Sequence, residues 1–293
     1  MRRTILALAA LSTALAATPA QAEPLVLKPN GPWNVDFADN TCRLAGFFGE
    51  GDDRHVMILD QYWPGPQFGL TVAGPGVRHF RSLKPARVRF SEALEPLMAT
   101  PFTGSLGDAG TAVIFSTLEI DKGEREANKA DYSDRGGLPQ LDVALGKQVQ
   151  FIELHQNGRS VRLETGRLDA TFGLLNQCTA GLLREWGLDP EQHLTAQSGP
   201  RWINKGALTQ RIIDSYPRGA LIKGEQGIMR MRVIVSAEGT VESCTILKAT
   251  NTETLESPAC KVMQTARFEP ARDAAGAPFR SLYVTSISYR IRS

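Results

Sequence analysis

The chain of 293 residues carries 33 basic and 31 acidic side chains, so its formal net charge at pH 7 is only +2. A charge this close to zero argues against a nucleic-acid-binding protein, which normally has a strongly basic surface. The hydrophobic content of 42% is ordinary for a globular protein.

Residues 1–22 have the pattern of a secretory signal peptide. Arg2 and Arg3 precede an apolar run, Ile5 to Ala17, which is shorter than the roughly 20 residues that a transmembrane helix needs. Ala20-Gln21-Ala22 then has the small-x-small form that signal peptidase accepts, so we expect cleavage after Ala22. This predicts a periplasmic protein that does not span the membrane once processed. The alternative is an uncleaved N-terminal anchor.

Removal of 22 residues from 293 leaves 271, which suggests two domains. We expect a mainly β domain at 23–187, a linker at 188–204 and a small domain at 205–293. Residues 23–199 carry 17 basic against 23 acidic side chains, and residues 200–293 carry 14 against 8, so the net charges are about −6 and +6. These opposite charges favour docking of the two halves, or reflect different outer partners.

The N-terminal half reads mainly as β-strands, because short runs rich in β-branched and aromatic residues alternate with Gly, Pro, Asn and Asp. The expected strands are Trp33–Phe37, Val56–Tyr62, Phe68–Ala73, Ala86–Phe90, Thr111–Ile120, Gln148–Leu154 and Val161–Glu164. This spacing predicts a sandwich or a partly open barrel. Apolar residues at helical intervals between Asp169, the expected N-cap, and Trp186 predict a helix that closes the domain.

Four cysteines in an exported chain suggest two disulfides, for which three connectivities exist. Pairing within domains is the simplest choice, and it joins Cys42 to Cys178 and Cys244 to Cys260. Free or metal-binding thiols are the alternative, although the sequence has no C-x-x-C motif.

The C-terminal segment reads as αββαβ with a three-stranded antiparallel sheet, so the chain as a whole is α+β. Its expected elements are a helix at Leu208–Ser215, a strand from Gly227 to Val235, a strand at Val241–Lys248, a helix with Ser257 as N-cap and Pro258 as first residue, and a strand at Leu282–Ile291. The two strands in the middle form a hairpin in which Gly239 takes a positive φ.

Several short motifs occur in a fixed order along this segment. They are Tyr216-Pro217 followed by Ala220, Gly224-x-x-Gly227, Gly239-Thr240-Val241, Arg267-Phe268-x-Pro270-Ala271 and Gly276-Ala277-Pro278. Each is weak alone, but the ordered set over about 80 residues closely resembles the TonB C-terminal domain family.

The resemblance implies a domain that receives an extended peptide, the TonB box of an outer-membrane transporter, as an added strand. An exposed sheet edge has unpaired backbone groups that bond such a strand, and alternate side chains give selectivity. The expected peptide-binding edge consists of Leu282, Tyr283, Val284, Thr285, Ile287 and Tyr289. The other interpretation of these tyrosines and isoleucines is that they cover the two helices.

Two departures from the family affect the expected role. A TonB energy transducer has an N-terminal membrane helix and a proline-rich spacer. We expect neither here, because the apolar run belongs to a signal peptide and the linker at 188–204 is short. We therefore expect a soluble binding or scaffolding protein related to transmembrane transport systems. The alternatives are a cell-envelope structural protein that contacts peptidoglycan, and a hydrolase activity in the N-terminal domain.

No residue pattern indicates catalysis, a metal or a cofactor. His55, His79, His155 and His193 are scattered and are expected to be surface or turn residues. Glu50, Asp52 and Asp53 supply oxygen atoms suited to Ca²⁺, but the twelve-residue liganding pattern is missing, which favours a solvated loop. A groove around Trp63 and Phe68 would suit a glycan or peptide, and a turn with buried aromatics is the alternative. We therefore expect a protein without enzymatic activity.

Overall fold

The computed structural model describes residues 23–38, 40–120, 136–215, 217–223, 227–248 and 258–289. The signal peptide, its cleavage site after Ala22, the N-cap Ser257, the motif residues Tyr216 and Gly224, and Ile291 lie outside the described residues. None of the helices in these described ranges has the length and apolar character needed to span a bilayer.

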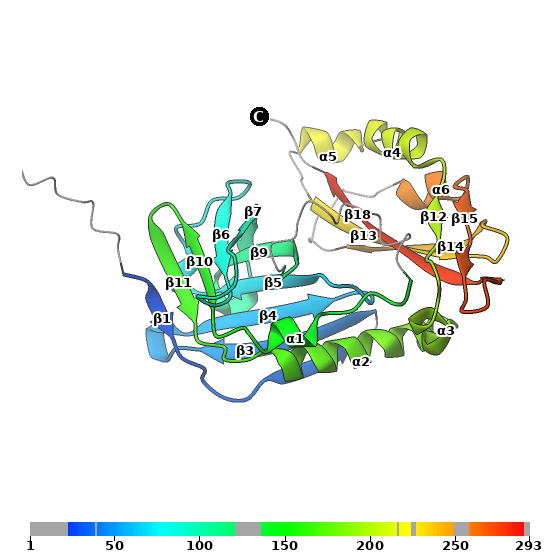
Figure 1. Cartoon of the computed structure of the whole chain (residues 1–293). Helices are drawn as coiled ribbons and strands as arrows, with labels where there is room; N and C mark the ends of the chain where they lie inside the picture. The colour runs from blue at the N-terminus through cyan, green and yellow to red at the C-terminus, as the bar shows by residue number, and fades with distance from the viewer. Residues whose placement is uncertain are drawn as a thin grey trace, which may run out of the picture.

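The N-terminal part contains two open β-sheets and one long helix (Figure 1). The six-stranded sheet has the order β2-β3-β4-β5-β9-β8, formed by Asn34–Ala38, Thr41–Phe48, His55–Gln61, Phe68–Ala73, Thr111–Leu118 and Phe102–Ser105. The five-stranded sheet has the order β1-β11-β10-β6-β7, formed by Leu25–Leu27, Arg159–Leu163, Ile152–Gln156, Ala86–Arg89 and Leu97–Ala99. Helix α2 (Asp169–Glu185) completes this part, together with α1 (Val143–Gly146) and the 3₁₀ turns Gly51–Asp53, Pro75–Val77 and Gly107–Ala109.

One hydrophobic core joins the two sheets and α2. Leu59 and Phe115 of the six-stranded sheet, Leu154 of the five-stranded sheet and Phe172 of α2 belong to the same buried cluster. Because these residues lie at alternate positions of their strands or on one face of the helix, each element contributes one apolar surface to the shared core. The expected mainly β fold with a closing helix is confirmed, and both sheets are open.

Some local expectations for the N-terminal part were wrong. Strand β3 was not expected, because Arg43 and Gly46 interrupt the apolar pattern of its sequence. In the structure its side chains alternate regularly between buried and half-buried. Strand β10 begins at Ile152 and not at Gln148, since the N–H groups of residues 150 and 151 both donate to the carbonyl of Phe90. Asp169 is the first residue of α2 and not its N-cap.

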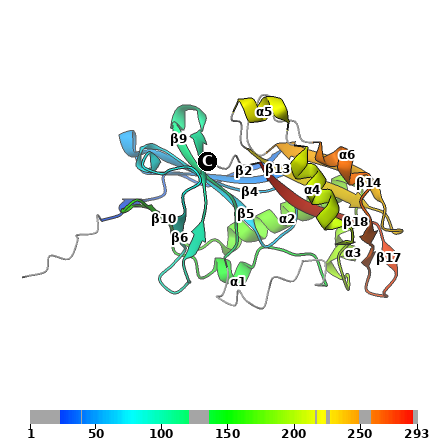
Figure 2. The same ribbon diagram turned by 90° about the horizontal axis from the view of Figure 1, so that it is seen from above.

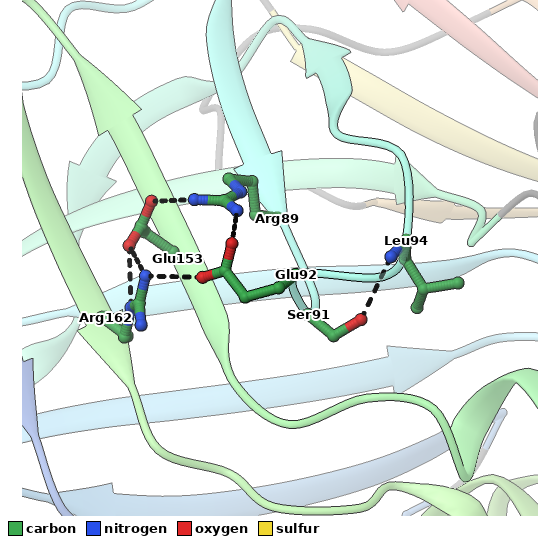
Figure 3. A network of polar contacts seen from close by, with 6 residues as sticks. All are labelled: Arg89, Ser91, Glu92, Leu94, Glu153 and Arg162. Carbon is green, nitrogen blue, oxygen red and sulfur yellow. Dashed lines mark hydrogen bonds and ion pairs between the residues drawn. The ribbon is translucent and has the colours of Figure 1, made fainter.

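A partly buried ion-pair network stabilises the outer face of the five-stranded sheet (Figure 3). Glu153 of β10 pairs with Arg162 of β11 at 2.7 Å and with Arg89 of β6 at 3.6 Å, and both arginines also contact Glu92. The guanidinium of Arg162 lies 3.9 Å above the ring of Phe151. The network thus connects three neighbouring strands, and its charges balance.

The C-terminal part is built around a three-stranded antiparallel sheet of order β14-β13-β18, formed by Val241–Lys248, Gly227–Val235 and Ser281–Tyr289. Helices α4 (Lys205–Asp214) and α6 (Ala259–Met263) cover the face of this sheet that carries Met231 and Val233, while α5 is Arg218–Ile222. The expected αββαβ order is confirmed. Helix α6 begins one residue later than expected, with Pro258 as its N-cap.

Short strands that the sequence did not predict extend the C-terminal part. They are β12 (Arg201–Trp202), β15 (Phe268–Glu269), β16 (Ala271–Arg272) and β17 (Pro278–Phe279). The turn at Gly239, with φ of 79°, contacts β15, because its carbonyl accepts a hydrogen bond from the N–H of Phe268 at 2.9 Å.

The structure pairs the cysteines within the two parts. Cys42 of β3 is bonded to Cys178 of α2, and Cys244 of β14 to Cys260 of α6. The Cα–Cα distances of 5.9 and 5.4 Å lie within the normal range for disulfides. Each bond thus connects a strand to the helix that packs against it.

Residues 188–204, which we expected to form an irregular linker, are largely folded. Helix α3 (Pro190–Leu194) occupies the first part, and β12 pairs with β15 of the C-terminal part. At the start of α3, Asp189 is an N-cap that accepts a hydrogen bond from Glu191 N–H, and Pro190 is the first helical residue. Asp is favoured as an N-cap because its side-chain oxygen accepts a hydrogen bond from the first turn. Pro is favoured as the first helical residue because the N–H that it lacks would have no partner there.

Candidate functional site

The two parts meet along β13 and β18, as Figure 2 shows from above. Arg230 in the central strand β13 is buried, and its Nη2 donates to the carbonyl of Ser116 in β9 at 2.8 Å. The same guanidinium lies 3.8 Å from Asp60 Oδ1 and 4.0 Å from the centre of the Tyr62 ring. Burial raises the pKa of Asp60, and the charges of Arg230 and Arg43 oppose this shift. Docking therefore places a cation of the basic half on an anion of the acidic half.

Two further residues of β13 extend this interface. Arg232 donates to Asn40 Oδ1 at 2.7 Å, and its guanidinium lies 4.0 Å above the ring of Trp186. Ile234 packs in a cluster with Leu183 and Leu188. The face of β13 that carries Arg230, Arg232 and Ile234 is thus covered by the N-terminal part.

Strand β18 forms one edge of the three-stranded sheet, and no strand of the described residues pairs with its outer side. By register, its side chains divide between the two faces of the sheet. Tyr283, Thr285 and Ile287 lie on the face of the helices, and Leu282, Val284 and Ser286 lie on the face that meets the N-terminal part.

The side chain of Tyr283 lies on the face of the sheet that the helices cover. Its ring is buried in the C-terminal core, 5.0 Å from the ring of Phe268 and 5.8 Å from that of Trp202. Ile287 packs against the same core. The alternative interpretation, in which these residues cover the helices, therefore holds for this face. The side chain of Tyr289 lies outside the described residues, although its backbone belongs to β18.

A groove with a volume of about 380 Å³ runs along β18 between the two parts. Residues 281–286 of β18 line it together with Phe279 and residues 198–200. The N-terminal part supplies residues 63–67 and 137–139. The volume lies in the range of about 300–1,000 Å³ that is typical of ligand sites. The expected edge strand thus lies beside a groove whose position between the two parts the sequence did not indicate.

Hydrogen bonds from Gln61 hold the loop of residues 63–67 in place. Gln61 is buried, and its Nε2 donates to the carbonyl of Gly65 at 2.9 Å and to that of Gln67 at 2.8 Å. Trp63 lines the groove, whereas Phe68 is buried in the N-terminal core. The two aromatic residues that suggested a groove in the sequence thus have different roles, and only Trp63 contributes to it.

The groove has no charged lining among the described residues, but its wall contains two buried polar atoms of interest. His193 Nε2 and Ser281 Oγ have no hydrogen-bond partner within the described part of the chain. His193 Nδ1 lies 2.7 Å from the carbonyl of Asp189. Because a carbonyl only accepts, Nδ1 carries the proton of the neutral ring and Nε2 is an acceptor. Burial lowers the pKa of His193, which favours this neutral form.

Two of the four histidines are buried, which corrects the expectation of surface or turn positions. His193 is one, and His55, which is 0% exposed, is the other. His55 Nδ1 lies 2.7 Å from the Asp53 carbonyl, and Gly76 N–H donates to Nε2 at 2.9 Å. Because the backbone satisfies both ring nitrogens of His55, its role is structural. His79 and His155 are half-buried.

The acidic stretch that suggested Ca²⁺ forms an exposed 3₁₀ turn with Asp52 and Asp53 in its first turn. No group of three or more His, Cys, Asp or Glu in the described residues is arranged to hold a metal ion. The groove along β18 is therefore the candidate functional site.

Comparison with known proteins identifies the domain that carries the groove strand β18. A search of the curated proteins found no match. The family model of the Gram-negative bacterial TonB protein C-terminal matches residues 214–291, which include α5, α6 and the whole three-stranded sheet. Proteins of this family interact with partners such as outer-membrane transporters. Residues 214–291 are therefore a TonB C-terminal domain, and they support a TonB-like role for this chain in the Gram-negative cell envelope.

Proposed function

We propose that this chain is a soluble, non-catalytic periplasmic protein that binds an extended segment of another polypeptide by adding it as a strand to β18. The observation that carries this proposal is the edge strand beside the groove, because no strand of the described residues pairs with its outer side. A TonB box of an outer-membrane transporter is the partner that the family suggests.

The edge supplies affinity through its backbone. In an antiparallel edge strand, every second residue directs its N–H and C=O outward, where a peptide strand about 4.8 Å away can bond them. Docking of the N-terminal part on Arg230 and Arg232 leaves these groups beside a preformed groove. A site that exists before binding loses less conformational entropy when the ligand binds.

Backbone-methylated peptides distinguish strand addition from other modes of binding. The probe is a synthetic eight-residue peptide of alternating Val and Thr with a short soluble tail, titrated into the full chain by calorimetry. We expect N-methylation of one set of alternate residues to abolish binding, and methylation of the other set to be tolerated, because only one set donates to β18. Equal binding of all three peptides would contradict the proposal.

Two exposed serines on the same face of the sheet provide a matched pair of variants. Ser286 lies in β18 and lines the groove, whereas Ser243 lies in the opposite edge strand β14. We expect Ser286→Trp to weaken binding of the probe at least tenfold by filling the groove, and Ser243→Trp to leave it unchanged. Hydrogen exchange of β18 amides should slow on binding in the unmodified chain. Slowing in β14 alone would place the peptide on the other edge and contradict the assignment.

A further inference from the structure

We infer that the N-terminal part forms the second wall of the peptide site and restricts it to uncharged, mainly apolar extended segments. This inference rests on the proposed function, because it assigns the partner chemistry of the same groove. It gives the N-terminal part a role in recognition that the TonB C-terminal match, limited to residues 214–291, does not cover.

The two walls of the groove come from different parts of the chain and are both apolar. Trp63, Pro66 and Leu138 lie on the N-terminal side, and Leu282 and Val284 lie on β18. Among the described residues, no Asp, Glu, Lys or Arg lines the groove. A charged side chain of a bound peptide would therefore lose hydration without gaining an ion pair.

Two cations of the central strand β13 are already engaged with the N-terminal part. Arg230 contacts Asp60 and the Ser116 carbonyl, and Arg232 contacts Asn40 and the ring of Trp186. Neither residue lines the groove. An acidic peptide would thus have to break contacts between the two parts of the chain in order to form an ion pair with either of them.

Both walls are held in place before a ligand binds. Gln61 fixes the loop that carries Trp63 and Pro66 through its two hydrogen bonds. Leu138 of one wall and Leu282 of the other pack against the same hydrophobic cluster, which contains Ile234 and thus connects the two walls. A rigid apolar site discriminates against charged ligands more strongly than a flexible one, since it cannot open to readmit water.

The composition of the chain argues for an external occupant. Residues 121–135 join two of the stretches that line the groove, but nine of these fifteen residues are Asp, Glu, Lys or Arg. The described lining of the groove contains no such side chain. His193 and Ser281 line the groove, and their Nε2 and Oγ atoms are buried without a hydrogen-bond partner among the described residues. The occupant that fits best is an apolar peptide strand with occasional Ser, Thr, Asn or Gln.

The test compares five peptides on the full chain: the Val and Thr probe, and four versions in which alternate side chains on one face are Lys or Glu. Both possible faces are substituted in turn. We expect the probe to bind at least tenfold more tightly than the Lys and Glu peptides that are substituted on the face toward the wall. If the Lys and Glu peptides bind as tightly as the probe, the inference is wrong.

Variants of the wall separate this inference from the proposed function. Trp63→Ala should reduce the preference for the uncharged probe, and Trp33→Ala, the same truncation at a residue that does not line the groove, should retain it. Pro66→Glu should make the Lys peptide bind more tightly than the Glu peptide, which is a gain that misfolding cannot produce. If these variants leave the preference between the peptides unchanged while the methylated peptides behave as expected, strand addition is supported and the role of the N-terminal wall in selectivity is contradicted. If methylation has no effect, the proposed function itself fails.

Discussion

Replacement of Arg230 by Met tests how much the contact between the two parts contributes to the free energy of unfolding. Arg230 is 6% exposed, so its guanidinium is almost completely removed from water. Met keeps most of the aliphatic side chain and removes the hydrogen bond to Ser116, the ion pair with Asp60 and the contact with the Tyr62 ring. The buried carboxylate of Asp60 then retains only Arg43 as an opposing charge.

The size of the effect follows from these contacts. A hydrogen bond from a charged donor contributes about 1.5–3 kcal/mol, and removal of one partner of a buried ion pair costs about 3–5 kcal/mol. These terms overlap because they belong to one side chain, so we expect Arg230→Met to lower the free energy of unfolding by about 3–5 kcal/mol. Because Asp60→Asn removes the charge that Arg230 neutralises, the double variant should lose less than the sum of the two single losses.

Urea unfolding followed by circular dichroism measures these differences. Arg211, an exposed arginine of α4, provides the matched control, and Arg211→Met should change stability by less than about 0.5 kcal/mol. A loss below 1 kcal/mol for Arg230→Met, or strict additivity with Asp60→Asn, would refute the view that this charged contact holds the two parts together.

Two further predictions concern the backbone and pH. At Gly239 an added Cβ would lie 2.0 Å from the Phe268 carbonyl oxygen. At Gly276, which has a similar positive φ, the nearest atom to an added Cβ is Gln197 Oε1, 3.8 Å away. Gly239→Ala should therefore lower the melting temperature clearly more than Gly276→Ala, for which we expect a cost of about 1–2 kcal/mol; equal effects would exclude the clash. Burial lowers the pKa of His55, so the unfolded state binds its proton more readily, and stability should fall as the pH drops below about 6.5 by up to about 1.4 kcal/mol per pH unit. Urea unfolding between pH 7.5 and 5 should show a flatter profile for His55→Asn, and identical profiles would rule out this contribution.

Local patterns were sufficient to predict much of the C-terminal part. Alternation of apolar residues predicted β13 and β14 with their observed limits, and the turn at Gly239 has the positive φ expected for its hairpin. The observed disulfides, Cys42 to Cys178 and Cys244 to Cys260, are also the two that pairing within domains predicted. These features depend on residues that are close in sequence or belong to one compact unit, so periodicity and turn chemistry are enough to indicate them.

The site itself depended on contacts between distant residues. Arg230 and Arg232 have the alternation of a solvated strand face, and only the docking of a second unit covers them. Trp63 lies opposite Leu282 although more than 200 positions separate them in the chain. Hydrophobic periodicity indicates which face of a strand is apolar, but it carries no information about which neighbour covers the other face. The tertiary structure therefore decided that the edge strand lies beside a groove with two walls.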